Sequence, residues 1–201
     1  MKFLNKMSKL ILASQSKVRK QILDKNKIFT EVHPSNVDEE IIKNSLLKEK
    51  ASPEIISKNL AEIKANKVSQ KNPNDIVIGA DSVIDLDGEI ISKPENRNAA
   101  LDILKKLNGK SHNLISSVCI SRNGSMIWNY TDKATLLMKN LSEEEIKDYL
   151  SKISDEKLYA YNVYQIEGEG RKLFLEIRGD ENTIMGLPIN QIKEYLNNLN
   201  L

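Results

Sequence analysis

Short apolar runs alternate with amphipathic stretches along the chain, and this pattern predicts a mixture of strands and helices. Residues 9–13 form a brief apolar run that is typical of a buried strand. Residues 75–80 (DIVIGA) are apolar at nearly every position, so we expect a strand that is covered on both faces. This strand is expected to carry Asp81 at its carboxyl end. A further strand is expected at 28–33.

Helices are expected where apolar residues recur at intervals of three and four. Ser16 opens such a pattern, and Pro53 opens another with Ile56, Leu60 and Ile63 on one face. Ser142 and Glu145 have the spacing of a capping box. The predicted helices are 16–26, 39–50, one that begins at Pro53, 94–107, one that ends near Ile153 after Ser142, and a last one that begins near Pro188.

Turn dipeptides join the remaining strands in pairs. Asp87-Gly88 predicts a hairpin within 82–92, and Asn123-Gly124 predicts a second, longer hairpin. The further strands expected are 112–122, 125–138, 163–166 and 172–178. Strands and helices mixed in this order predict an α/β protein with a mixed twisted sheet flanked by helices, in a single domain over residues 1–201.

Composition and charge exclude several classes of protein. A chain of 201 residues that is 40% hydrophobic and 29% charged can bury a sizeable core. The formal net charge of +2 is too balanced for bulk nucleic-acid or polybasic membrane binding, so we expect neither partner. One cysteine excludes an internal disulfide framework. The apolar part of the N-terminal segment, 10–13, is too short for an export signal, so we expect a cytoplasmic protein.

Asp81 and a set of basic and hydroxyl residues indicate phosphate chemistry. Open α/β sheets bind ligands beyond the carboxyl ends of their strands, where Asp81 is expected. Ser14-Gln15-Ser16 joins a strand to a helix N-terminus, which favours anions. Lys93 precedes Pro94 and is expected at another helix entrance. A carboxylate beside cations and hydroxyls favours phosphate chemistry with a metal ion over acyl transfer.

Each of these residues also has a structural interpretation when it is taken alone. Ser14 and Ser16 have the residue type that caps helices. Asp81 can equally be a turn residue, and Lys64 and Lys93 can be solvated surface charges.

The other chemically distinctive residues are expected to be structural. His33 and His112 are far apart and lack partner ligands, so they predict no zinc site. His112 is expected to make a structural hydrogen bond at a strand start, and Cys119 is expected in the core. Trp128 is expected to pack, with an interface role as the alternative.

Taken in order, several segments resemble the Maf family of nucleoside triphosphate pyrophosphatases. LILASQSKVRKQIL (10–23) is similar to the family's opening Leu-Ala-Ser-x-Ser followed by basic residues. Each match is weak alone, but the ordered set covers nearly the whole chain and is specific. The other matching segments are Lys64-Ala65, IVIGADSV (76–83), Ser92-Lys93-Pro94, Asn108-Gly109-Lys110-Ser111-His112, VYQIEGEG (163–170) and MGLP (185–188).

The resemblance implies a fold and an activity. The fold is a mixed sheet flanked by helices, with two lobes around a cleft as in inosine triphosphatases, assembled as a homodimer. The activity is that of a cytoplasmic house-cleaning hydrolase. It cleaves the α–β phosphoanhydride of non-standard or modified nucleoside triphosphates, with Mg²⁺ or Mn²⁺, to a monophosphate and pyrophosphate. The alternative from another class is a nucleotide-binding regulatory protein of cell division with little turnover.

The resemblance also implies roles for individual residues. Asp81 matches the family's proton acceptor and is expected to bind the metal with Glu39, for which the neighbouring Asp38 is the alternative. Lys64 and Lys93 are expected to act in catalysis by holding the triphosphate and offsetting charge on the leaving pyrophosphate. The residues expected to bind phosphate groups besides these lysines are Ser14, Ser16, Arg19 and Lys20.

Departures from the family pattern bear on base choice. Val18 stands where many members have Arg, which keeps the regulatory alternative open. Ser82 replaces a common Thr, and Glu167 stands where members acting on dTTP and UTP carry Gln. With Arg19, these two residues are expected to set specificity. A carboxylate accepts hydrogen bonds from guanine and favours the charge of 7-methylguanine, so 7-methyl-GTP is the hypothesis for the substrate. The alternative is that Glu167 only faces solvent.

Overall fold

The computed structural model describes residues 8–160 and 163–199, whose strands form one seven-stranded mixed sheet. The strand order is β2-β1-β3-β5-β6-β7, and β4 pairs with β3 beside this path. Strand β1 is parallel to both of its neighbours, while all other pairs are antiparallel. The strands are β1 (Leu10–Leu12), β2 (Glu31–Val32), β3 (Ile76–Leu86), β4 (Glu89–Ile91), β5 (Ser111–Arg122), β6 (Ser125–Met138) and β7 (Phe174–Arg178).

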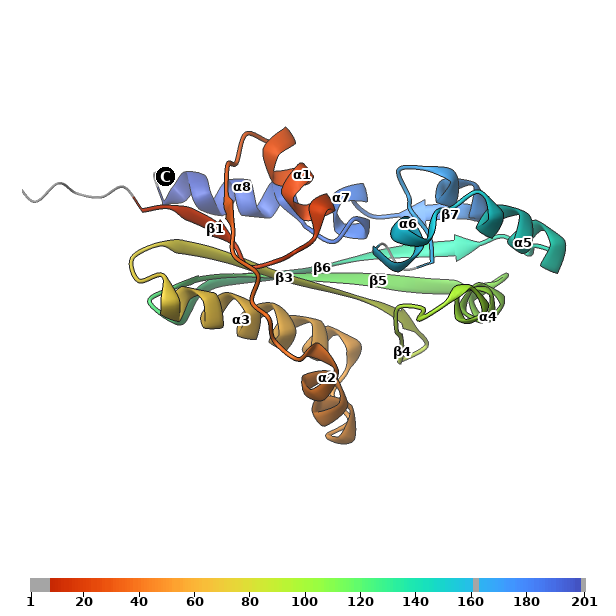
Figure 1. Cartoon of the computed structure of the whole chain (residues 1–201), viewed down its shortest axis with the longest axis horizontal. Helices are drawn as coiled ribbons and strands as arrows, with labels where there is room; N and C mark the ends of the chain where they lie inside the picture. The colour runs from red at the N-terminus through yellow and green to blue at the C-terminus, as the bar shows by residue number, and fades with distance from the viewer. Residues whose placement is uncertain (1–7, 161–162, 200–201) are drawn as a thin grey trace, which may run out of the picture.

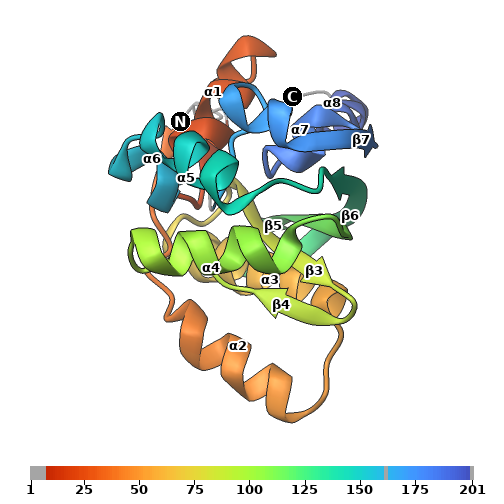
Figure 2. The same ribbon diagram turned by 90° about the vertical axis from the view of Figure 1, so that its right-hand side faces the viewer.

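Helices cover both faces of the sheet. Helix α3 lies along one face and α1 and α8 along the other, while α4, α5 and α6 gather toward one end (Figure 1). Figure 2 shows α2 projecting away from the body of the molecule. The helices are α1 (Lys17–Lys25), α2 (Glu39–Lys48), α3 (Pro53–Lys71), α4 (Arg97–Leu107), α5 (Glu143–Ser151), α6 (Asp155–Ala160), α7 (Glu181–Ile184) and α8 (Ile189–Asn198), with a 3-10 helix at Glu169–Leu173.

Local capping interactions set where the helices begin. The Ser16 hydroxyl accepts the backbone N–H of Arg19 and caps α1. Both halves of the capping box between Ser142 and Glu145 are present at α5. Pro53 occupies the first turn of α3, where its missing N–H costs nothing. These starts confirm the predictions from the sequence.

Two large apolar clusters divide the molecule into two lobes. The first packs α1 and α8 on the sheet around Leu12, Ile78 and Ile192. The second surrounds the far ends of β3, β5 and β6 and takes in α4 and α5, with Leu104 and Ile146 fully buried. Because three long strands run through both clusters, the sheet itself connects the lobes. None of the helices in the described ranges is long and apolar enough to cross a membrane.

Helix α3 lies unusually close to β3 because Gly79 has no side chain. A Cβ built at Gly79 would lie 2.6 Å from the Ala65 nitrogen and 2.8 Å from the Ala65 Cβ, and closer still to the Ala61 carbonyl oxygen. Ala61 and Ala65 of α3 face the glycine, so the backbone of the helix packs directly on the backbone of β3. This contact sets the height of α3 above the strand on the face where Asp81 lies.

Two strand predictions are wrong. Strand β3 does not end at Asp81 but continues to Leu86, because β5 pairs with it far beyond the end of β1. The segment 163–166 forms no strand in the structure. Its apolar residues Val163, Tyr164 and Ile166 are instead buried in the second cluster as part of an irregular segment. Burial alone therefore produced the pattern that suggested a strand.

Two further elements differ in extent from the prediction. Residues 28–33 contribute only Glu31–Val32 to the sheet, as an exposed edge strand beside β1. Helix α4 begins at Arg97 rather than at Pro94, since the Asn96 side chain caps it by accepting the Ala99 N–H. Lys93 therefore lies in the loop between β4 and α4, not at a helix entrance.

The structural interpretations of His112 and Cys119 are confirmed. His112 is 2% exposed at the start of β5, and its Nε2 lies 2.9 Å from the Tyr164 hydroxyl. Burial lowers the pKa of His112 to about 4. Cys119 lies in the core against α3, and burial raises its thiol pKa to about 11, which makes it a poor nucleophile. Trp128 stacks on Tyr195.

Candidate active site

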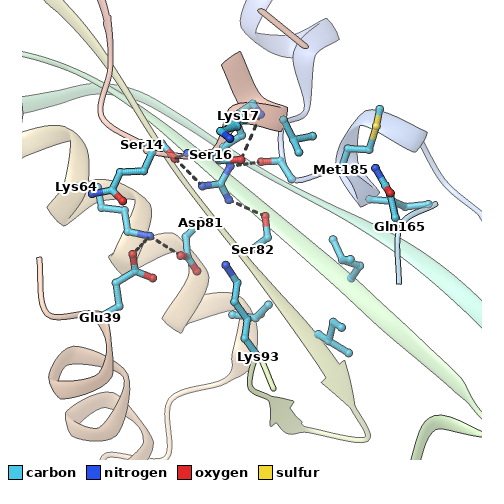
Figure 3. Close-up of a pocket in the computed structure, with 18 of the residues that line it drawn as sticks. Ser14, Ser16, Lys17, Glu39, Lys64, Asp81, Ser82, Lys93, Gln165 and Met185 are labelled. Carbon is cyan, nitrogen blue, oxygen red and sulfur yellow. Dashed lines mark hydrogen bonds and ion pairs between the residues drawn. The ribbon is translucent and has the colours of Figure 1, made fainter. Parts of the chain in front are cut away.

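A cavity of about 750 Å³ opens between the two lobes. One wall comes from the loop after β1 and the start of α1, and the floor comes from α3 and β3. The opposite wall belongs to the second lobe and includes the segments 154, 156–157 and 164–167. Figure 3 shows the side chains that face this space. The cavity brings together residues from Ala13 to Gly186, which are distant in the sequence.

Asp81 lies on the floor of the cavity and is almost completely buried, with 5% exposure. Its Oδ1 accepts a hydrogen bond of 2.7 Å from Lys64 Nζ, and the same ammonium lies 2.9 Å from Glu39 Oε1 (Figure 3). Desolvation raises the pKa of Asp81, while the charges of Lys64 and Arg19 oppose that rise. The carboxylate is therefore a stronger base than an exposed aspartate.

The close packing of α3 on β3 explains why Lys64 reaches Asp81. Lys64 follows Ala61 by one helical turn and lies next to Ala65, the two residues that contact Gly79. The Lys64 side chain is only 6% exposed, so the alternative that Lys64 is a solvated surface charge is wrong. The Glu39 carboxylate comes from the first turn of α2, which otherwise projects from the body. Lys64 thus bridges two acidic groups from different elements.

Arg19 is held by the protein through four of its five N–H donors. Its Nε donates to the Gly186 carbonyl at 2.8 Å, and its Nη1 donates to the Ala80 carbonyl at 2.9 Å and to Ser14 Oγ at 3.3 Å. Its Nη2 donates to Ser82 Oγ at 3.1 Å. Burial lowers the pKa of Arg19, while the negative charge of Asp81 opposes this shift. The guanidinium lines the cavity in one fixed orientation.

Lys93 approaches the same space from the loop before α4. Its amino group points toward Asp81 and Ser82 (Figure 3). Desolvation, and then the charge of Arg19, lowers the pKa of Lys93. The preceding residue, Ser92, accepts a 3.0 Å hydrogen bond from Lys43 of α2, which ties this loop to the helix that carries Glu39.

Ser14 and Ser16 line the cavity and also shape the chain around it. The Ser16 N–H donates to Ser14 Oγ at 3.2 Å, and Ser16 Oγ caps α1. The helix-capping interpretation is therefore correct for Ser16 but not for Ser14, whose hydroxyl accepts the Ser16 N–H before the helix begins. Neither arrangement excludes phosphate binding by these hydroxyls. Both hydroxyls lie where the first turn of α1 faces the cavity.

Lys20 is the predicted phosphate-binding residue that the structure does not bring to the cavity. It is absent from the lining, and its ammonium pairs with Asp24 one turn along α1. The helical period decides this, because Lys17 and Val18 at the start of α1 face the cavity instead. Lys17 Nζ contacts Glu156 Oε1 at 3.2 Å, across the cavity from one lobe to the other.

The two residues expected to set specificity with Arg19 both line the cavity. Ser82 contacts Arg19 and, on its other side, Ser116 Oγ at 2.8 Å. Glu167 is exposed at the cavity edge, where its Oε1 accepts a hydrogen bond of 3.0 Å from Gln165 Nε2. Both interpretations of Glu167 thus describe part of its position, since it borders the cavity and faces solvent.

The MGLP segment (185–188) is part of the resemblance, but the sequence predicts no role for its residues. Met185 and Gly186 form part of the cavity wall, and the Gly186 carbonyl binds Arg19. Gly186 has a φ of +92°, a conformation that favours glycine. The Gly-Leu-Pro turn was the available signal for a chain reversal at this point.

The donor set fits a divalent cation that arrives with a phosphate ligand. Asp81 and Glu39 are two carboxylates that face one another across the Lys64 ammonium. Within residues 8–160 and 163–199, no group of three or more His, Cys, Asp or Glu side chains could hold a metal ion. Mg²⁺ in nucleotide sites is commonly held by one or two carboxylates together with water and substrate phosphates.

The cavity combines a basic carboxylate with a surrounding set of cations. Arg19 of α1, Lys64 of α3 and Lys93 of the loop before α4 bring positive charge to the cavity that contains Asp81. Polyanions such as triphosphates are stabilised by such an arrangement, and a water molecule beside Asp81 could be activated by it.

Comparison with known proteins gives a family and named relatives. The family model described as Maf-like protein matches residues 9–199. A Pelagibacter ubique (strain HTCC1062) protein named nucleoside triphosphate pyrophosphatase is 68% identical over 94% of this chain and 97% of its own length. A Rhizobium etli protein named 7-methyl-GTP pyrophosphatase is 37% identical over 90% of this chain and 91% of its own. The solved structure of the Staphylococcus aureus Ham1 protein aligns with 95% of this chain and 99% of its own, at 15% identity and a TM-score of 0.46.

Proposed function

The chain belongs to the family of Maf-like proteins, and we propose that it hydrolyses nucleoside triphosphates to monophosphates and pyrophosphate in the cavity around Asp81. One observation carries this proposal: a buried carboxylate with a raised pKa lies among Arg19, Lys64 and Lys93 in a cavity of about 750 Å³. The name of the Pelagibacter ubique relative supports the same activity.

Asp81 acts as the base in this proposal. A water molecule beside the carboxylate transfers a proton to the carboxylate while the water oxygen forms a bond to the α phosphorus. The bond between the α and β phosphates then breaks, and its electron pair leaves with pyrophosphate. An ordinary aspartate is a weak base for water, so burial that raises the pKa of Asp81 favours the reaction. The charge of Lys64 and its hydrogen bond to Asp81 oppose that rise.

The cations bind the triphosphate and stabilise the leaving group. Lys93 and Lys64 both line the cavity with their ammonium groups, and Arg19 lines it with a guanidinium held by the protein. Positioning and electrostatic stabilisation account for most of the catalysis in phosphoryl transfer, so the charges of Lys64 and Lys93 carry much of the rate, while Arg19 binds the triphosphate. Ser14 and Ser16 add hydroxyls at the start of α1, where the helix dipole also favours anions.

We also propose that Mg²⁺ or Mn²⁺ accompanies the substrate, with Asp81 and Glu39 as its protein ligands. The ion, when bound, supplies positive charge to the phosphates and acidifies a bound water. Lys64 lies between the two carboxylates and keeps them in place until the phosphates enter.

The base is proposed to be a modified purine such as 7-methylguanine. Glu167 lies at the cavity edge with its carboxylate bonded to Gln165, and a carboxylate favours the N–H donors and positive charge of that base. The name of the Rhizobium etli relative supports this choice. A cytoplasmic house-cleaning role and a homodimer are proposed with it. A regulatory protein with little turnover is the alternative, since Val18 lines the cavity where many family members have Arg.

A panel of triphosphates tests both activity and base choice. Pyrophosphate release is measured with Mg²⁺ for 7-methyl-GTP, GTP, dTTP and UTP, using the unmodified chain, Glu167→Gln and Glu169→Gln. Glu169 is the matched control, since it pairs with Lys172 and does not line the cavity. We expect 7-methyl-GTP to be preferred and only Glu167→Gln to weaken that preference.

Each contrary result of the panel has its own meaning. Faster hydrolysis of dTTP and UTP than of 7-methyl-GTP overturns the purine hypothesis and leaves the activity intact. Binding of the nucleotides without release of pyrophosphate overturns the activity and favours the regulatory alternative.

A further inference from the structure

Two fully buried polar residues lie directly behind the cavity and have no role in the reaction proposed above. Ser116 on β5 pairs across the sheet with Ser82, and Thr183 lies in α7; both are 0% exposed. Neither lines the cavity. Polar groups are buried at a cost unless their hydrogen bonds are satisfied, so the partners of these two residues indicate their purpose.

The chemistry of the partners determines every donor in this group. Ser116 Oγ lies 2.7 Å from the Thr183 carbonyl oxygen, which only accepts, so the Ser116 proton is used there. Ser82 must then donate its own proton to Ser116 Oγ, 2.8 Å away. Arg19 Nη2 can only donate, and it donates a hydrogen bond to Ser82 Oγ. The hydrogen bonds therefore run in one direction from Arg19 to Thr183.

Gly186 closes this chain into a ring. Its N–H donates to the same Thr183 carbonyl oxygen at 3.0 Å, and its own carbonyl accepts from Arg19 Nε at 2.8 Å. A Cβ at Gly186 would lie 3.0 Å from Ser82 Oγ and 3.4 Å from Arg19 Nε, so the ring has no space for a side chain. Separately, the Thr183 hydroxyl donates to Asp132 Oδ2 at 2.6 Å and anchors α7 to β6.

The ring restricts Arg19 to one orientation. Four of its five N–H groups are used within the protein, which leaves one on Nη2 for a ligand. The Ser82 hydroxyl already donates its hydrogen bond to Ser116, so its oxygen can only accept a hydrogen bond from a ligand. Hydrogen bonds that run in one direction reinforce one another, so removing a member weakens the others.

We propose that Ser116 and Thr183 are positioning residues for substrate binding. Through the ring they hold the guanidinium of Arg19 and the Gly186 wall in place before the triphosphate arrives. Preorganisation of this kind lowers the cost of binding. The proposal rests on the proposed function of the cavity as a triphosphate site.

Ser116→Ala tests the proposal, with Ser121→Ala as the matched control. Ser121 lies on the same strand, is also 0% exposed, and also makes a 2.7 Å hydrogen bond, but to Asn66 of α3. With 7-methyl-GTP and GTP, we expect Ser116→Ala to raise KM about tenfold while kcat stays within about twofold. Ser121→Ala is expected to leave both constants unchanged.

A second measurement without ligand separates this proposal from the proposed activity. The chain has five arginines, so the Nε–H signal of Arg19 can be assigned by NMR in protein labelled with ¹⁵N-arginine. We expect Ser116→Ala to shift this signal and to speed its exchange with water about tenfold, and Ser121→Ala to leave it unchanged. This result holds whether or not the protein hydrolyses a nucleotide.

Two outcomes overturn the proposal. An Arg19 signal that is identical in Ser116→Ala and the unmodified protein means that the ring does not hold the guanidinium. A changed signal with an unchanged KM means that the ring does not serve the substrate. If Ser116→Ala does not fold, Ser116→Cys replaces it, since it keeps a side chain of similar shape and puts a weakly hydrogen-bonding thiol in place of the hydroxyl that joins Ser82 to the Thr183 carbonyl. The same readouts and the same two outcomes then apply, with an expected rise in KM of about threefold.

Discussion

Asp81 experiences opposing influences that together suit a base. Burial disfavours its charge, while Lys64 at 2.7 Å and the nearby Arg19 favour it. The net result is a raised pKa with the carboxylate still hydrogen-bonded to an ammonium. A residue in the middle of a strand obtains this environment only because α3 supplies Lys64 from above the sheet.

Replacing Asp81 by Asn should abolish most of the turnover. The amide keeps the shape but cannot accept a proton from water, so we expect kcat to fall at least about 100-fold. Pyrophosphate release under saturating substrate measures the change. Asp85→Asn is the control, because Asp85 lies on the same strand, outside the cavity, and accepts the Gly88 N–H in the hairpin. Full activity in Asp81→Asn would show that another group is the base.

His112 should make the fold sensitive to mild acid. Burial lowers its pKa from the ordinary value of 6.5 to about 4, so the unfolded chain binds the proton first as the pH falls. The contribution of the neutral His112 imidazole to the free energy of unfolding is fully present above pH 6.5 and is lost as the pH falls toward 4. Between pH 7 and pH 5 the expected loss is about 2 kcal/mol.

Urea unfolding at the two pH values measures this loss. His112→Gln cannot titrate in this range, and it retains a polar group for the Tyr164 hydroxyl. The variant should therefore lose less stability than the unmodified protein on acidification. Equal losses in both proteins would contradict the role given to His112.

At the scale of elements, the contact between α3 and β3 joins folding to chemistry. Gly79 allows the helix to lie against the strand, and the same contact brings Lys64 to Asp81 two residues further along. The wall formed by α7 and the following turn depends in a similar way on Gly186. The absence of a side chain at Gly79 thus determines the distance between the Lys64 ammonium and the Asp81 carboxylate.

Gly79→Ala should therefore impair both stability and activity. The added methyl would overlap the α3 backbone, and we expect a loss of about 2 kcal/mol in the free energy of unfolding. Displacement of α3 should also lower kcat, since it moves Lys64. Gly168→Ala is the control, because its Cβ would meet nothing closer than 3.5 Å, and its effect should stay within about 0.5 kcal/mol. A stable and active Gly79→Ala would contradict this account.

At the scale of the whole molecule, the cavity exists because two lobes share one sheet. The first lobe contributes Ser14 and Arg19, and the second contributes Gln165 and Glu167. The contact between Lys17 and Glu156 spans the cavity, but both side chains are largely exposed, so it adds little to stability. The substrate itself is thus expected to join the two walls.

Removal of divalent metal should stop turnover without unfolding the protein. Excess EDTA is expected to reduce pyrophosphate release to background, and added Mg²⁺ or Mn²⁺ is expected to restore it. The melting temperature should not change, because the two candidate carboxylates already share the Lys64 ammonium when no metal is bound. Undiminished turnover after chelation, with metal content checked by elemental analysis, would contradict the metal proposal.

Much of the local structure could be predicted from the sequence. Ser16, the Ser142–Glu145 box and Pro53 mark helix starts, and Asn123-Gly124 marks the long hairpin, as the structure confirms. Capping and turn formation act within about four residues, so the information lies in adjacent positions. The length of β3, the irregular path of 163–166 and the late start of α4 were predicted wrongly, because remote pairing and burial decide them.

The sequence by itself determined which residues could do chemistry, and it grouped Ser14, Lys64, Asp81 and Lys93 as candidates. Only the tertiary structure decided how they meet. It joined Lys64 to both Asp81 and Glu39, and it turned Lys20 away. It also placed Ser116 and Thr183 behind Arg19, which no sequence pattern suggested. The reason is geometric, since the direction of a side chain depends on helix phase, strand register and the distance between packed elements, and these are set by contacts far apart in the chain.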